Sequence, residues 1–191
     1  MLTLSCPRCR LHHNCICQLQ PNLTTDIQLE LLLHSNEFKR RTNTGLLLRD
    51  SIAANVHQWQ RKPPCAELTQ QIAACPDQFA LVYPSEDAIC LSEAQDVKHF
   101  IILDGTWQEA AKIYRQSPYL HHLPKITLKP QQASAYCLRA NQAEGNLCTY
   151  EVAIQLCKEL GLIKEANQLE AFWLSYLQVF EADRSGYQFK G

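Results

Sequence analysis

Glycine is scarce in this chain, with only six glycines among 191 residues. The glycine-rich motifs that cradle phosphates are absent, since neither G-x-x-x-x-G-K-S/T nor G-x-G-x-x-G occurs. The sequence also lacks the G-x-S-x-G turn of serine hydrolases and the H-E-x-x-H motif of zinc proteases. These absences argue against a P-loop ATPase, a Rossmann dehydrogenase and an α/β-hydrolase.

Long apolar runs are missing as well. Apolar runs such as Leu31–Leu33 and Phe100–Leu103 are short, whereas a membrane-spanning helix needs about 20 apolar residues. Met1 is followed by polar residues and cysteines in place of a basic and then apolar leader. We therefore expect neither a membrane protein nor a secreted precursor.

Net charge is close to zero, because 18 basic residues face 19 acidic ones. The average hides an asymmetry. Residues 1–65 hold eight Lys or Arg and four Asp or Glu, whereas the remaining residues hold ten and fifteen. The basic first third is compatible with a polyanionic partner such as a nucleic acid.

Cysteine is abundant, with ten residues in all. Without a secretory leader they indicate a reducing compartment, which we take to be the cytoplasm. Four of them, Cys6, Cys9, Cys15 and Cys17, lie within C-P-R-C-R-L-H-H-N-C-I-C. Their spacing can fill a tetrahedral shell around one ion, and thiolates favour zinc or an iron–sulfur cluster. His12 and His13 are possible substitutes for one ligand.

The alternative for this segment is a flexible arm with four unpaired thiols. A closed site of four cysteines would be structural, because the arm is too short to fold alone. We expect a metal-binding arm over residues 1–24 and one larger domain over 25–191. The scattered cysteines other than Cys148 are expected to be small core residues.

Apolar periodicity predicts strands that alternate with helices. Strands are expected at 26–34, 79–83, 99–103 and 125–128, and helices at 46–57, 66–74, 106–116, 149–160 and 163–181. Thr44 and Thr149 are the expected N-caps of two of these helices, and Gly161 is the expected C-terminal cap of one. This alternation indicates an α/β fold with a mostly parallel sheet.

Ligands bind beyond the carboxyl ends of strands in open parallel sheets. This rule selects the loop after His34, the Asp104-Gly105-Thr106-Trp107 turn, and the loop before Thr149. Each also has a simpler local explanation: a solvated basic turn for the first, and helix caps for the other two.

Six motifs in order make the chain resemble the DTW-domain family. The motifs are C-P-R-C-x5-C-I-C at 6–17, H-S-N-E-F with T-N-T-G at 34–45, I-L-D-G-T-W-Q-E-A at 102–110, S-P-Y-L at 117–120, S-A-Y-C-L-R at 134–139 and L-C-T-Y-E-V-A at 147–153. Two positions depart from the family pattern: Cys137 where a basic residue is expected, and Val152 where alanine is usual.

The resemblance implies a SPOUT-like fold with a C-terminal trefoil knot, and S-adenosylmethionine as cofactor. It implies transfer of the 3-amino-3-carboxypropyl group of that cofactor to N3 of a uridine in the variable loop of tRNA. Asp104 would be the catalytic base. N3 of uridine is a weak acid, so one carboxylate beside it suffices, and the neutral thioether that leaves needs no general acid.

The remaining motif residues are assigned to binding. The cofactor neighbourhood comprises Thr106, Trp107, Tyr136, Arg139, Leu147, Cys148, Thr149 and Glu151. Residues expected to contact the uridine or the cofactor are His34, Glu37, Asn43, Thr44 and Gly45. Those expected to follow tRNA phosphates are Arg8, Arg10, Lys39, Arg40 and Arg41.

Two other functions compete with this interpretation. One is methyl transfer to RNA from the same cofactor, which would release S-adenosylhomocysteine in place of methylthioadenosine. The other is a zinc-stapled RNA-binding module without catalysis, against which the intact Asp104 and L-C-T-Y-E motif argue. The sequence suggests tRNA as partner, no membrane, and no particular protein partner.

Overall fold

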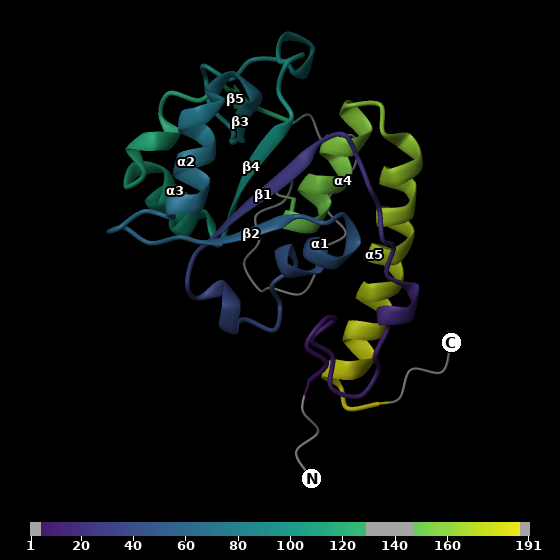
Figure 1. Ribbon diagram of the computed structural model, residues 1–191. Helices are drawn as coiled ribbons and strands as arrows, with labels where there is room; N and C mark the ends of the chain where they lie inside the picture. The colour runs from purple at the N-terminus through teal and green to yellow at the C-terminus, as the bar shows by residue number, and fades with distance from the viewer. Residues whose placement is uncertain (1–4, 129–146, 188–191) are drawn as a thin grey trace.

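The computed structural model describes residues 5–128 and 147–187. Its centre is a five-stranded sheet in the order β2-β1-β4-β3-β5, in which every neighbouring pair is parallel (Figure 1). The strands are β1 Gln28–Leu33, β2 Asn55–Gln58, β3 Phe79–Val82, β4 His99–Asp104 and β5 Lys125–Ile126. The predicted mostly parallel α/β fold is confirmed.

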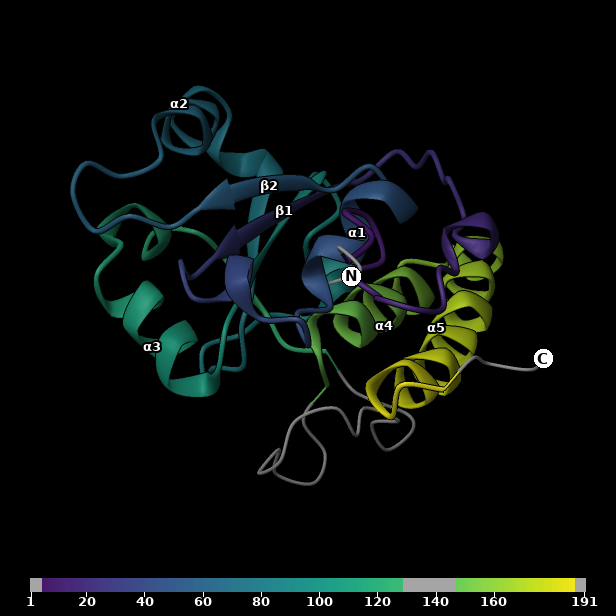
Figure 2. The same cartoon turned by 90° about the horizontal axis from the view of Figure 1, so that it is seen from below.

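Helices cover both faces of the sheet. The bounds are α1 Gly45–Ser51, α2 Ala66–Ala74, α3 Trp107–Arg115, α4 Thr149–Glu159 and α5 Ile163–Arg184. Short 3-10 turns are η1 Cys17–Leu19, η2 Glu37–Lys39, η3 Pro76–Gln78, η4 Leu91–Glu93 and η5 Pro118–Leu120. In Figures 1 and 2, α2 and α3 lie on one side of the sheet and α1, α4 and α5 on the other.

Side chains that point alternately to the two faces of the central strands produce these two layers. Leu31 and Ile102 belong to the core beneath α1, α4 and α5, whereas their neighbours Leu32 and Ile101 belong to the core beneath α2 and α3. Successive side chains of a strand point to opposite faces. A strand that is apolar at consecutive positions must therefore be covered on both sides, as parallel sheets are.

One predicted helix is wrong in its second half. The sequence predicts a helix over 46–57, but α1 ends at Ser51 and residues 55–58 form β2 at the edge of the sheet. Ile52 leaves the helical conformation and Ala53 has a φ of 51°. Pairing of residues 55–58 with β1 overrides the local helical spacing, which a short apolar pattern cannot resolve.

The middle of the sheet buries a charged residue. Glu30 of β1 is inaccessible to solvent, and its carboxylate accepts hydrogen bonds from His57 Nε2 at 2.7 Å, His99 Nδ1 at 2.9 Å and Asn55 Nδ2 at 3.1 Å. Burial by itself raises the pKa of Glu30, but these partners outweigh burial and lower it. The edge strand β2 is thus bound to β1 by side chains as well as by its backbone.

The N-terminal arm packs on the C-terminal half of α5. Cys9, Leu11 and Ile16 are buried in the same core as α4 and α5. The Asp183 carboxylate accepts hydrogen bonds from the backbone N–H groups of residues 12–14, at 2.6 to 3.1 Å. In Figure 1 the purple arm lies beside the yellow end of α5.

Cysteine burial differs from the expectation for the scattered residues. Cys157 and Cys148 are buried, Cys65 is half-buried, and Cys75 and Cys90 are exposed. Core packing therefore does not explain the last two cysteines. Within the described residues no helix is long and apolar enough to cross a membrane. The predicted trefoil knot depends on the path of residues 129–146, which lie outside the described residues.

We expect Glu30→Gln to lower the stability of the fold and to change its pH dependence. Because folding lowers the pKa of Glu30, the ionised carboxylate stabilises the fold above the ordinary carboxyl pKa of about 4.3, and this stabilisation is lost as pH falls through the lower folded value. The variant should lose about 1–3 kcal/mol at pH 7, and its stability should fall less than that of the wild type between pH 5 and pH 3.

Urea unfolding at several pH values measures both effects. Glu86→Gln, at an exposed carboxylate, is the matched control and should unfold like the wild type at every pH. An E30Q variant whose stability parallels the wild-type curve from pH 7 to pH 3 would show that the Glu30 contacts contribute nothing.

Candidate functional site

Three sequence motifs meet at the carboxylate of Asp104. Asp104 ends β4 and is 3% exposed. Its Oδ1 accepts a hydrogen bond from Thr149 Oγ1 at 2.7 Å, and its Oδ2 accepts one from Asn43 Nδ2 at 2.7 Å. Asn43 precedes α1 and Thr149 begins α4, so one side chain joins the three segments that the strand-end rule selected.

Gly45 allows this convergence. A Cβ atom at Gly45 would lie 2.3 Å from Asp104 Oδ2 and 3.2 Å from Thr149 Cγ2. Only a glycine lets the first turn of α1 approach the carboxylate so closely. The T-N-T-G motif therefore supplies an amide donor for Asp104 and the space for that side chain.

Asn43 continues the network to a second buried carboxylate. Its Nδ2 also donates to Glu37 Oε2 at 2.8 Å, and Glu37 is completely buried. The Asn43 Oδ1 atom accepts from the backbone N–H of Leu46 at 2.9 Å, in the first turn of α1. Thr44 is the N-cap residue, as predicted, but makes no capping bond with its side chain. Asn43 fills that role.

Arg40 bridges Glu37 to Glu109 of α3. Arg40 Nη1 contacts both carboxylates, and its Nη2 donates to Glu109 Oε1 at 2.9 Å. Burial alone raises the pKa of Glu109, but Arg40, the Thr106 amide and Asn36 together hold that pKa well below its usual range. The carboxylate of Glu109 is 3.3 Å from His34 Nδ1.

Glu109 and Asn36 are members of this network that the sequence interpretation missed. Glu109 forms a capping box with Thr106: the Thr106 N–H donates to Glu109 Oε2 at 2.9 Å. The Asn36 amide donates to Glu109 Oε1 at 2.8 Å. A T-x-x-E pattern signals a capping box in sequence, so Glu109 was detectable as a cap. Its contact with Arg40 was not.

The N-terminus of α4 has the same kind of capping. Cys148 is the N-cap, and Thr149, expected in that position, is the first helical residue, with its hydroxyl bound to Asp104. The Cys148 N–H donates to Glu151 Oε2 at 2.9 Å, and Trp173 Nε1 donates to Glu151 Oε1 at 3.4 Å. Burial raises the pKa of the Cys148 thiol well above its usual value.

Some of the other predicted cofactor residues lie near Asp104, and others lie outside the described residues. Trp107 is 51% exposed at the start of α3, directly after Asp104-Gly105-Thr106. Leu147 is half-buried just before the N-cap of α4. Tyr136 and Arg139 lie outside the described residues. Of this set, the structure brings Thr106, Trp107 and Thr149 to the carboxyl end of β4, where Asp104 lies.

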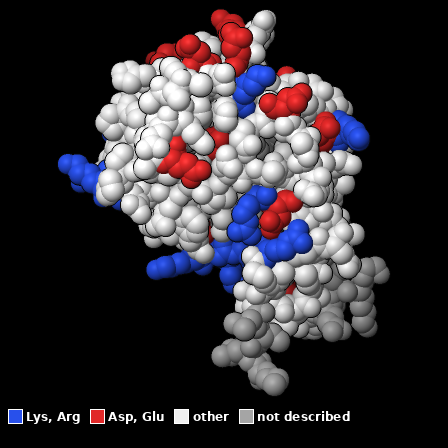
Figure 3. All heavy atoms as spheres, viewed as in Figure 1, with Lys and Arg blue, Asp and Glu red and all other residues white. Residues whose placement is uncertain are grey.

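Most of the predicted phosphate-binding residues have acidic or carbonyl partners within the protein. Arg8 pairs with Asp50 at 3.4 Å, and Arg41 pairs with Asp183 at 3.1 Å. Arg10 donates to the Phe38 carbonyl at 2.9 Å. Lys39 is exposed. In Figure 3, viewed as in Figure 1, several Lys and Arg side chains near the middle and right of this face lie beside Asp or Glu, whereas those at the left edge stand apart from acidic residues.

The four cysteines of the arm lie together at one point. The sulfur atoms of Cys6, Cys9, Cys15 and Cys17 all lie within 4.8 Å of one another. Such a set of four thiols at tetrahedral spacing fits a single zinc ion. His12 and His13 are not part of the cluster.

Hydrogen bonding favours a thiolate in this cluster. Burial by itself raises the pKa of Cys6, but the backbone N–H groups of Cys9 and Arg8 and the thiol of Cys17 outweigh burial, and the pKa falls to about 6. A thiolate is the form that binds metal. Burial raises the pKa of Cys9 and of Cys17, so a metal ion in this cluster is supported by the gathering of the four sulfur atoms and by the single favoured thiolate of Cys6.

These features define a class of protein. The chain is an α/β protein with a doubly covered parallel sheet, polar residues converging on one strand-end carboxylate, and a four-cysteine cluster in an N-terminal arm. Comparison with known proteins gives the family. The family model described as the DTW domain matches residues 3–180, and the chain belongs to the DTW-domain family.

A curated relative is tRNA-uridine aminocarboxypropyltransferase 2 of Drosophila melanogaster. The two sequences are 34% identical over 150 residues, which cover 74% of this chain and 59% of the relative. The chain thus spans about three-fifths of the length of that protein. No solved structure matches the chain with statistical significance.

We expect the purified protein to hold about one zinc ion per chain, and Cys9→Ser to lose it. Cys9 is the buried member of the cluster, and a structural zinc site contributes directly to folding. Elemental analysis gives the metal content, and thermal unfolding gives the stability. Cys75→Ser, at an exposed cysteine outside the cluster, is the control and should keep its metal. Equal metal content in both variants would contradict a four-cysteine metal site.

We expect Gly45→Ala to be destabilising by about 1–3 kcal/mol, the usual cost of overpacking. The added methyl group would overlap Asp104 Oδ2, so either the carboxylate or α1 must move. Denaturant unfolding measures the change. Arg49→Ala, on the exposed side of the same helix, should change stability by less than about 0.5 kcal/mol. If both variants unfolded alike, the close contact at Gly45 would carry no energy.

Proposed function

We propose that this chain transfers the 3-amino-3-carboxypropyl group of S-adenosylmethionine to N3 of a uridine in the variable loop of a tRNA, releasing methylthioadenosine. Membership of the DTW-domain family and the similarity to a protein named for aminocarboxypropyl transfer to tRNA uridine support the proposal. The observation that carries it is the position of Asp104, held at the carboxyl end of β4 by Asn43 and Thr149.

The carboxylates around Asp104 fit a cationic cofactor. Three carboxylates, those of Glu37, Asp104 and Glu109, gather at the carboxyl end of the sheet, and one cation, Arg40, pairs with two of them. The resulting negative charge complements a sulfonium. The half-exposed indole of Trp107 offers an aromatic face for an adenine. When bound, S-adenosylmethionine supplies an electrophilic carbon next to its sulfonium.

In the proposed reaction Asp104 acts on the uridine. Its carboxylate accepts the proton from N3–H, which makes N3 a nucleophile. The hydrogen bonds from Asn43 and Thr149 fix both carboxylate oxygens and hence the direction in which the proton is accepted. The choice among the carbons bound to the sulfonium is a matter of alignment, within about 3–3.5 Å of the nucleophile.

The remaining assignments are part of the same proposal. The cofactor side of the site comprises Thr106, Trp107, Leu147, Cys148, Thr149 and Glu151, together with Tyr136 and Arg139, which lie outside the described residues. His34, Glu37, Asn43, Thr44 and Gly45 form the side nearer the uridine. Thr149 and Asn43 act mainly by positioning Asp104, since their side chains are bound to it. The cysteine-rich arm over 1–24, the catalytic domain over 25–191, a zinc ion in the arm, a SPOUT-like knot and a cytoplasmic location complete the proposal.

We expect Asp104→Asn to lower the rate of methylthioadenosine release by at least about 100-fold, the usual contribution of a general base. The variant should fold, because the new carboxamide can accept from Asn43 and donate to Thr149 Oγ1 in the same geometry. Chromatography of a reaction with tRNA and S-adenosylmethionine measures the product. Asp96→Asn, at an exposed carboxylate, should react like the wild type.

The products decide between the proposed reaction and methyl transfer. Methylthioadenosine together with an aminocarboxypropyl-uridine in the digested tRNA supports the proposal. If the products are S-adenosylhomocysteine and a methylated uridine, the proposed reaction is wrong and the protein is an RNA methyltransferase. A wild-type rate in the folded Asp104→Asn variant would remove Asp104 from its role as the base.

A further inference from the structure

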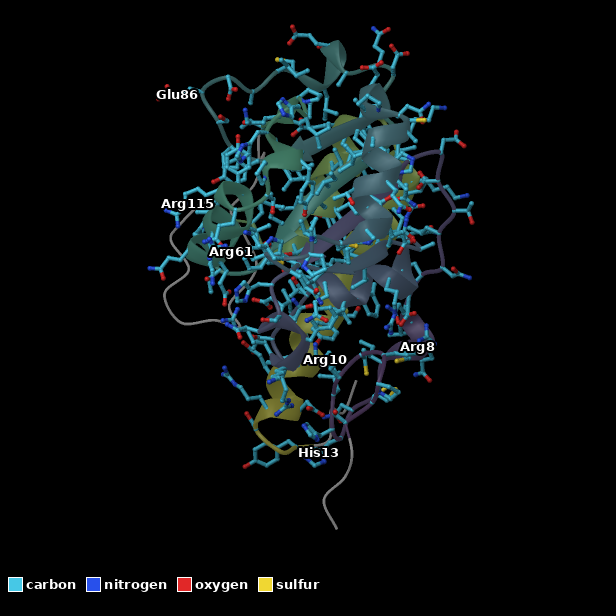
Figure 4. All side chains as sticks on the ribbon, turned by 60° about the vertical axis from the view of Figure 1, so that its left-hand side comes forward. Arg8, Arg10, His13, Arg61, Glu86 and Arg115 are labelled. Atoms are coloured by element: carbon cyan, nitrogen blue, oxygen red, sulfur yellow. The ribbon has the colours of Figure 1, made fainter. Side chains whose placement is uncertain are left out.

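A second basic surface lies on α3 and on the loop after β2, and it consists of residues that the sequence analysis did not assign to phosphate binding. It consists of Arg61 and Lys62 in the loop after β2, and of Lys112 and Arg115 in α3. All four residues are exposed. Lys112 and Arg115 are three positions apart in the helix and therefore lie on the same side of it. Figure 4 labels Arg61 and Arg115 on one side of the molecule, beside α3.

Buried contacts attach the loop to the helix. Trp59 Nε1 donates to Ser117 Oγ at 3.0 Å, and both side chains are buried. The Lys112 ammonium lies 5.6 Å from the centre of the Trp59 ring, within the range of a cation–π contact. Arg61 is two residues from Trp59, and Arg115 is two residues from Ser117. The Trp59–Ser117 contact therefore places the two guanidinium-bearing segments side by side.

This surface differs in its ion pairing from the set of residues that the sequence analysis assigned to phosphate binding. Residues 51–66 and 110–128 contain no Asp or Glu. Within the described part of the chain, Arg61, Lys62 and Arg115 form no ion pair, whereas Arg8, Arg40 and Arg41 each pair with a carboxylate. Cations without internal partners can neutralise external phosphates without first breaking a salt bridge.

The surface also adjoins the candidate site. The Trp59 ring stacks on His34 with centroids 5.6 Å apart and an interplanar angle of 23°. His34 follows β1 and contacts Glu109 of the Asp104 neighbourhood at 3.3 Å. A polyanion lying on Arg61, Lys62 and Arg115 would thus continue along the carboxyl end of the sheet towards Asp104.

We propose that the basic surface formed by Arg61, Lys62, Lys112 and Arg115 binds the sugar-phosphate backbone of the substrate tRNA. The inference rests on the proposed function, because it assigns the RNA-binding face of that same site. Guanidinium groups grip phosphate oxygens in bidentate fashion, and several together give a sequence-independent hold on the backbone. The uridine itself is selected elsewhere, at the Asp104 site.

The test is the double charge reversal Arg61→Glu with Arg115→Glu. Binding of an in vitro transcribed tRNA is measured by fluorescence anisotropy at several salt concentrations. We expect affinity to fall at least tenfold at 100 mM salt. The plot of log K against log salt should become less steep by about 1.5, since two phosphate contacts are lost and each contributes roughly 0.7–0.9 to the steepness. Lys98→Glu with Lys164→Glu makes the same change in net charge at exposed positions before β4 and in α5, and should stay within twofold of the wild type.

A parallel assay of methylthioadenosine release separates this inference from the proposed function. If R61E/R115E binds tRNA more weakly and K98E/K164E does not, and if the wild-type protein releases methylthioadenosine, both proposals are supported. Weakened binding without any turnover by the wild type supports the surface and rejects the proposed reaction. Wild-type binding by R61E/R115E, or equal losses in the K98E/K164E control, overturns the surface.

Discussion

The hydrogen bonds on the carboxylate of Asp104 organise the functional end of this protein. Asn43 and Thr149 each donate to one oxygen at 2.7 Å, so segments separated by 61 and 45 residues are held at the end of β4. Gly45 must lack a side chain for α1 to approach this carboxylate. Thr149, whose hydroxyl is bound to the carboxylate, is the first residue of α4 after the N-cap Cys148. An uncompensated carboxylate at this depth would be costly, which explains why two donors are committed to it.

Some basic side chains of this protein are paired with its own carboxylates, and others face solvent. Arg40 is committed to Glu37 and Glu109, and Arg41 is paired with Asp183, which also receives the backbone N–H groups of the N-terminal arm. These cations fix the loop after β1 to α3 and to the C-terminal half of α5. Arg61 and Arg115, by contrast, face solvent from a segment pair without acidic residues. A net charge of −1 therefore coexists with an exposed basic surface.

The N-terminal arm is integrated with the rest of the protein at two levels. Its four cysteines gather into one cluster, and its apolar residues Leu11 and Ile16 enter the core shared with α4 and α5. The Tyr176 hydroxyl donates to the Cys9 carbonyl at 3.2 Å. A metal ion in the cluster would therefore stabilise the contact with α5, and with it the position of Arg41 beside Asp183.

The amino-acid sequence predicts the α/β class, the positions of β1, β3, β4 and α2 to α5 to within a few residues, and the three strand-end segments that meet at Asp104. These depend on local apolar spacing and on capping residues such as Thr106, which neighbouring residues fix. Three features became visible in the folded protein alone: residues 55–58 form an edge strand, Glu109 pairs with Arg40, and Arg61 and Arg115 share a surface. The reason is that these features depend on partners distant in the chain, and local periodicity contains no information about such partners.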